Sequence, residues 1–229
     1  MKHIFFMVMM MGLLSCSDDD LSSYQAIDEP YEFEIPSNFP ELQYPVENNP
    51  PSKFGVELGR KLFYDGRLSS TGFVNCAFCH EQQHAFTHHG HNLSHGVNNR
   101  IGRRNAPATQ NLAFLDSYFY DGAVSFLNMV PNLPIHDENE MNETIPNIIQ
   151  KLKQDQDYQR LFSLAFDEED INSTNMMKAL AQFMTIMVSS NSKYDKFVRN
   201  EDNVTFTSEE TQGRQLFNDK CASCHATDL

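Results

Sequence analysis

Apolar residues recur at helical spacing along most of the chain from residue 53 onward. In four stretches most of them have a partner three or four positions away, so that each set falls largely on one face of a helix. These sets are Val56, Leu58, Leu62 and Phe63; Ile145, Ile148, Ile149 and Leu152; Tyr158, Leu161, Phe162 and Phe166; and Met176, Leu180, Phe183, Met184 and Met187. No alternating strand pattern of useful length appears, so the sequence predicts a mainly α fold with long loops.

Two of the helices carry start signals. Asn172 and Ser173 are cap candidates before the methionine-rich stretch, and Thr207 with Glu210 forms a capping-box pattern. The methionines at helical spacing are interpreted as core residues rather than ligands.

The N-terminus has the pattern of an export signal. Lys2 precedes an apolar run over residues 4–14 that ends in Leu-Leu-Ser before Cys16. About 20 apolar residues are needed to span a bilayer, so the run is too short. We expect a lipoprotein signal peptide over residues 1–15, lipidation of Cys16, and a periplasmic protein anchored to a bacterial membrane. An ordinary signal peptide with a chance cysteine is the alternative.

Residues 16–52 are acidic and rich in proline, which predicts an extended tether rather than a packed element. The folded part is expected to begin near Lys53. The formal net charge of −14 argues against nucleic acid as a partner and suits a basic redox protein.

The pattern Cys-x-x-Cys-His occurs twice, at Cys76, Cys79 and His80 and at Cys221, Cys224 and His225. It is the attachment site of c-type haem, in which both sulfurs join the porphyrin and the histidine binds the iron. Two covalent haem c groups are therefore predicted, and export agrees with this. Disulfide, zinc and redox-dithiol sites are the alternatives.

Several ordered blocks resemble the bacterial di-haem cytochrome c peroxidases, a family that includes the MauG-type enzymes. The resemblance covers about residues 55 to 229. Its blocks are Leu58-Gly59-Arg60-Lys61-Leu62-Phe63-Tyr64-Asp65, Arg67-Leu68-Ser69, the two haem motifs, Arg104-Asn105-Ala106-Pro107, Phe119-Tyr120-Asp121-Gly122, Glu140-Met141-Asn142 and Asn191-Ser192-Lys193-Tyr194-Asp195.

The resemblance implies two cytochrome c-like haem domains that reduce hydrogen peroxide to water with electrons from a small redox protein such as a c-type cytochrome. His80 would be the proximal ligand of the peroxidatic haem iron, Glu140 the catalytic proton carrier, and His225 the iron ligand of the electron-storing haem. Asn105 matches a family calcium ligand, and Tyr120 stands where an electron relay is expected. A homodimer is also left open.

The chain departs from the family pattern at several positions. Tyr120 replaces a tryptophan, and Ala123 replaces an arginine. The distal-pocket glutamine falls at Val130. The resting-state distal histidine falls at Val97, so either His95 serves as distal ligand or the first haem is open on that side.

Five further histidines follow the first motif: His84, His88, His89, His91 and His95. Imidazole suits copper and zinc, so a second metal site is one hypothesis. The run is also rich in glycine, asparagine and serine, and a solvated loop is the interpretation we favour from sequence.

Leu229 lies four residues past His225, so we expect the second haem domain to be incomplete. The expected divisions are a first, peroxidatic haem domain over residues 53–206 and the start of a second over residues 207–229. A di-haem peroxidase is the predicted function. A non-enzymatic electron-transfer cytochrome and a MauG-like protein-modifying oxidase are the alternatives.

Overall fold

The computed structural model describes residues 27–167 and 170–225. The signal peptide, Cys16 and the first part of the tether lie outside these residues. Within them the regular structure is helical, and β pairing is limited to isolated bridges. The helices are α1 (Lys53–Phe63), α2 (Cys76–Cys79), α3 (Asn132–His136), α4 (Ile145–Leu152), α5 (Gln156–Phe166), α6 (Ser173–Thr185), α7 (Lys193–Val198) and α8 (Ser208–Lys220). The predicted mainly α class is confirmed.

Six short 3-10 turns lie in the segments before and between the first α-helices. They are η1 (Val46–Asn48), η2 (Gly66–Leu68), η3 (Gln82–His84), η4 (Val97–Asn99), η5 (Leu112–Phe114) and η6 (Leu127–Met129).

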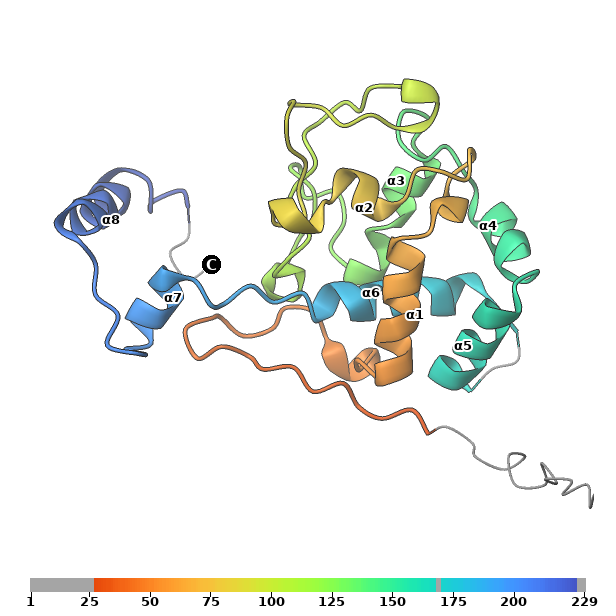
Figure 1. Ribbon diagram of the computed structural model, residues 1–229, viewed down its shortest axis with the longest axis horizontal. Helices are drawn as coiled ribbons and strands as arrows, with labels where there is room; N and C mark the ends of the chain where they lie inside the picture. The colour runs from red at the N-terminus through yellow and green to blue at the C-terminus, as the bar shows by residue number, and fades with distance from the viewer. Residues whose placement is uncertain (1–26, 168–169, 226–229) are drawn as a thin grey trace, which may run out of the picture.

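The core lies where α1 crosses α6, with α5 packed against α1 (Figure 1). The predicted apolar faces supply it, since Leu58, Leu62, Leu152 and Met176 are fully buried. Gly59 lets the two helices approach, because a Cβ at this position would stand 2.0 Å from the carbonyl oxygen of Ala179. The methionines of α6 are core residues, as expected.

The predicted caps are present. The Asn172 side chain accepts from the backbone N–H of Asn175 at the start of α6. Thr207 and Glu210 form the reciprocal capping box that begins α8. These ends are set by residues three positions apart, which explains why the sequence alone predicted them.

The tether prediction is wrong for residues 27–52. This segment has no α-helix, but it runs along the body and is anchored there (Figure 1). Tyr44 is buried and donates a backbone hydrogen bond to the Ala113 carbonyl (3.0 Å). Buried Asn49 donates to the Lys178 carbonyl (3.0 Å) and accepts from Gln182 (3.0 Å). Such contacts join residues more than 60 positions apart, so composition could not reveal them.

No helix in the described part of the chain is both long and apolar enough to cross a membrane.

Candidate functional site

The two Cys-x-x-Cys-His motifs fold into the same turn. In the first, the N–H of His80 donates to the carbonyl of Cys76 at 2.9 Å, and in the second, the N–H of His225 donates to the carbonyl of Cys221 at 2.9 Å. One helical turn therefore joins each first cysteine to its histidine. Local sequence determines this geometry, which explains its repetition in two different surroundings.

The imidazole of His80 has a defined orientation. Its Nδ1 lies 3.0 Å from the carbonyl oxygen of Phe86, which also accepts from the backbone N–H of Thr109 (3.2 Å). A carbonyl can only accept, so Nδ1 carries the proton and Nε2 keeps its lone pair. Burial lowers the pKa of His80 below its ordinary value, which favours the neutral ring that an iron ligand requires.

The motif cysteines differ in environment. Cys76 packs against the hydrophobic core, and burial raises the pKa of its thiol to about 12. Burial also raises the pKa of Cys79. Cys221 and Cys224 are exposed, and none of these four cysteines forms a disulfide. Two free sulfurs with an imidazole on one helical turn fit the covalent attachment of haem c, and a disulfide at either motif is not supported.

Glu140 lies in the turn after α3, beside the first motif. Its carboxyl is half-buried, and burial, with a smaller contribution from Asp137, raises its pKa above the ordinary value. The charge of Glu140 in turn helps to raise the pKa of Cys79, so the two side chains lie within electrostatic reach. The backbone of Glu140 is fixed by a hydrogen bond from Val97 to its carbonyl (2.8 Å).

Close contact between two loops explains the glycine before Val97. A Cβ at Gly96 would stand 2.6 Å from the Cα of Glu140 and 2.1 Å from the carbonyl oxygen of Asn139. The loop after the first haem motif is thereby held directly against the proposed proton carrier.

The distal-ligand alternatives are placed as follows. Val97 is buried in the hydrophobic core, and half-buried Val130 packs against this core. The Nδ1 of His95 lies 2.7 Å from Oδ1 of Asn99, and its ring faces His91 with ring centroids 4.9 Å apart. His95 is thus engaged within its own loop, and its role as a distal ligand stays a prediction.

Tyr120 and Asn105 lie on the surface. The Tyr120 side chain is 97% exposed, so the described part of the chain provides no packing that would mark it as a relay. Asn105 donates its amide to the carbonyl of Asn92 (2.9 Å), and neighbouring Arg104 pairs with Asp121 (2.8 Å). The relay and calcium roles both stay predictions.

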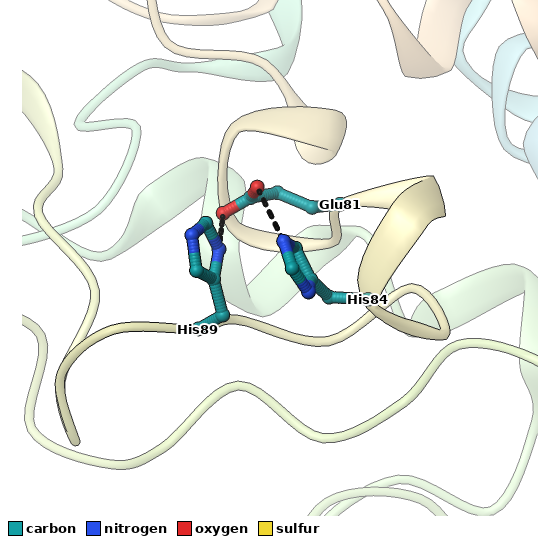
Figure 2. A group of neighbouring side chains, drawn as sticks. All are labelled: Glu81, His84 and His89. Atoms are coloured by element: carbon teal, nitrogen blue, oxygen red, sulfur yellow. Dashed lines mark hydrogen bonds and ion pairs between the residues drawn. The ribbon is translucent and has the colours of Figure 1, made fainter.

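The histidine-rich segment is a largely exposed loop, as expected, and it contains a cluster of side chains. Figure 2 shows the rings of His84 and His89 next to each other, both facing the carboxylate of Glu81, and the two rings are stacked with centroids 3.7 Å apart. The sequence interpretation missed Glu81. Its position three residues before His84 was the available signal, but η3 had to be recognised before the spacing had meaning.

The second motif follows α8, which lies beside the main body with α7 (Figure 1). No residue of α8 is buried, and Leu216 and Phe217 are exposed. Lys193 of α7 pairs with Glu210 at 2.6 Å, and Phe197 stacks on Phe206 with ring centroids 4.0 Å apart. These contacts connect α8 to α7 rather than to the core.

Two curated proteins illustrate what the sequence of this chain is similar to. The methylamine utilization protein MauG of Methylophilus methylotrophus is 30% identical over 184 residues, which are 79% of this chain and 54% of that protein. Cytochrome c peroxidase Ccp of Escherichia coli K12 is 32% identical over 172 residues, 74% of this chain and 36% of that protein. The chain spans about half the length, or less, of these curated relatives.

A solved structure shares the fold. A MauG-like protein associated with microbial copper homeostasis matches with a TM-score of 0.78 and 29% identity, over 86% of this chain and 59% of that one. The family model described as di-haem cytochrome c peroxidase matches residues 53–203, which include the first haem motif and Glu140. The chain therefore belongs to the di-haem cytochrome c peroxidase family.

Proposed function

We propose that this chain contains the peroxide-reducing centre of a di-haem peroxidase. The overall reaction would combine hydrogen peroxide with two protons and two electrons to give two waters, with the electrons supplied by a small redox protein. The observation that carries the proposal is Glu140, a half-buried carboxyl of raised pKa held within electrostatic reach of Cys79. Perturbed carboxyls beside a cofactor site are typical of proton-transfer groups.

The residues of the first motif fit the role of haem holder. Cys76 and Cys79 would anchor a haem covalently and His80 would bind its iron, which supplies peroxide binding and electron uptake when the group is in place. The Phe86 carbonyl fixes the tautomer of His80 and strengthens its ligand nitrogen.

Glu140 would move a proton between the two peroxide oxygens as their bond breaks. For this it must accept a proton first, so the deprotonated carboxylate is the active form. Because burial raises its pKa, activity is expected to fall as the pH decreases through that raised value.

Glu140→Gln tests this role. A positioned acid or base contributes about 10²- to 10⁴-fold, so peroxide reduction by the complete haem-loaded protein should slow on that scale, with an unchanged haem spectrum. The fall in activity at acid pH should also disappear.

Glu138→Gln is the matched control, since Glu138 is exposed and its carboxylate pairs with Arg100 and Arg103 on the surface. Its activity should match that of the unsubstituted protein. Turnover by Glu140→Gln that equals this control would assign the proton transfer to another group.

The second motif would hold the haem that receives and stores electrons. Exposed Cys221, Cys224 and His225 provide the same turn as the first motif, which supports attachment there. Chain matured in a host with haem-attachment machinery should gain the mass of two haems. A gain of one haem, with Cys221 and Cys224 unmodified, would contradict the two-haem proposal.

A MauG-like oxidase of protein side chains is the second candidate. It is favoured by the MauG proteins among the relatives and by Val97, whose buried side chain occupies the position of the resting-state distal histidine. Such an enzyme would oxidise residues of a partner protein. Rapid peroxide turnover with a reduced cytochrome, without modification of any co-expressed partner, would exclude it.

The protein is further proposed to be a periplasmic lipoprotein. The support is the apolar run and Leu-Leu-Ser before Cys16. Cys16→Ser should move the protein from the membrane to the soluble periplasmic fraction. Retention on membranes after a high-salt wash would show that something other than a lipid holds it.

A further inference from the structure

We propose that Glu81, His84 and His89 form a binding site for a divalent transition metal, separate from the haem iron. The site lies on the loop that follows the first haem ligand, His80. Its ligand chemistry is two imidazoles and one carboxylate. Zinc and copper(II) accept this set, whereas calcium and magnesium prefer oxygen ligands alone.

The distances suit one shared ion. Nδ1 of His89 lies 3.0 Å from Oε1 of Glu81, and Nε2 of His84 lies 3.8 Å from Oε2 (Figure 2). All the ligand atoms fall within 4.8 Å of one another. Ligands at about 2.0–2.1 Å from a tetrahedral ion stand about 3.3 Å apart. The rings of His84 and His89 are stacked with centroids 3.7 Å apart, so they would have to rotate away from each other for both to bind one ion.

The backbone brings these side chains together without the metal. The N–H of Glu81 donates to the carbonyl of Thr87 (3.0 Å), and the N–H groups of His84 and Phe86 both donate to the carbonyl of Glu81 (2.9 Å each). Left-handed conformations at Ala85 and Phe86 turn the chain back, which places His89 opposite Glu81. A closed turn reduces the conformational entropy that metal binding must overcome.

Two more imidazoles border the three ligands. Nδ1 of His88 lies 3.6 Å from Oε1 of Glu81, and Nε2 of His88 lies 3.2 Å from Nδ1 of His91. The His88 side chain is 9% exposed, and its Nδ1 has no hydrogen-bond partner among the described residues. A buried ring nitrogen without a partner is costly, and this one would be satisfied if His88 turned to bind the same ion.

The site is also accessible. Glu81, His88, His89 and His91 line an open cavity of about 680 Å³ together with Ala77 and Phe78 of the first motif, whereas His84 does not line it. The ligands of the proposed haem, Cys76, Cys79 and His80, do not line it. The proposed metal ligands and the proposed haem ligands are therefore different residues, although Ala77 and Phe78 of the first motif border the same cavity.

Calorimetric titration of the haem-loaded chain with Zn²⁺ alone tests the proposal. Haem loading matters because it occupies the motif sulfurs, which would otherwise bind zinc. We expect saturable binding of one Zn²⁺, and X-ray absorption at the zinc edge should show at least two imidazole nitrogens at about 2.0–2.1 Å.

His84→Asn combined with His89→Asn should weaken zinc binding about tenfold or more, since even outer partners of a metal site change affinity by about 10- to 100-fold. Glu81→Gln keeps the shape of the side chain and one oxygen but removes the negative charge, so it should also weaken zinc binding. His136→Asn is the control, because this exposed histidine lies on α3. The zinc affinity of this variant should equal that of the unsubstituted chain.

An unchanged haem spectrum in each variant shows that the fold is kept. Absence of saturable zinc binding in the unsubstituted chain would overturn the proposal. Equal affinity in the double variant would overturn it too, as would an absorption spectrum without imidazole ligands.

Discussion

Glu140 is held in a state that suits proton transfer but destabilises the fold at neutral pH. Its folded-state pKa is raised above 4.5 by burial and by Asp137. Between 4.5 and the raised value, the folded state holds a proton that the unfolded state has lost. Stability conferred by this group is therefore full below pH 4.5 and is lost as the pH rises through the folded pKa.

Glu140→Gln should accordingly increase thermal stability at neutral pH, because the amide is not charged and Glu140 accepts no side-chain hydrogen bond within the described residues. Below pH 4.5 the difference between the two proteins should largely vanish. Thermal unfolding, followed by circular dichroism from below pH 4.5 to pH 7, measures this difference in stability. A variant that is less stable at pH 7 than the unsubstituted chain would mean that the carboxylate has a stabilising partner.

The interface between α1 and α6 is determined by a residue without a side chain. Gly59→Ala would place a methyl group 2.0 Å from the backbone oxygen of Ala179, an atom that cannot rotate away. Separating the helices should cost about 1–3 kcal/mol of unfolding free energy, as overpacked cores do. Denaturant unfolding gives the value.

Gly213→Ala is the matched control, because a Cβ there meets no atom within 4 Å, and alanine favours the helix α8. Its core stability should be unchanged. Loss of stability in Gly213→Ala equal to that in Gly59→Ala would trace the effect to glycine replacement in general rather than to the contact with Ala179.

The helices and caps were predictable because each depends on residues a few positions apart, as at Asn172 and Thr207. The anchoring of residues 27–52 to the body was not predictable, because the hydrogen-bond partners of Tyr44 and Asn49 lie in distant segments. The same holds for the site. The haem motifs are local patterns. The pairing of Glu81 with His89 depends instead on a turn in which non-glycine residues adopt the left-handed backbone conformation, and such turns are difficult to predict from sequence.

At the scale of the whole molecule, the chain consists of a packed body and an exposed helix, α8, which is joined to it through α7 (Figure 1). Ten residues of α6 are buried, against none in the described part of α8. Helix stability in proteins comes mainly from such burial, so the two helices should open with very different free energies.

Hydrogen exchange should therefore show rapid exchange of the α8 amides and strong protection in α6. Mass spectrometry of peptides covering the two helices measures this directly. Equal protection would indicate that α8 docks on a surface of the body or on a partner in solution.

Burial of Cys76 has a consequence for how the protein is made. A thiol adds to a haem vinyl group best when it is accessible and deprotonated, yet in this fold the Cys76 thiol is packed against the core and its pKa is about 12. We therefore expect cofactor attachment at half-buried Cys76 to be easier before the body compacts around it than afterwards, whereas Cys221 and Cys224 are exposed in the folded chain. Folding of the body is thus expected to slow cofactor loading at the first motif and to leave loading at the second motif unaffected.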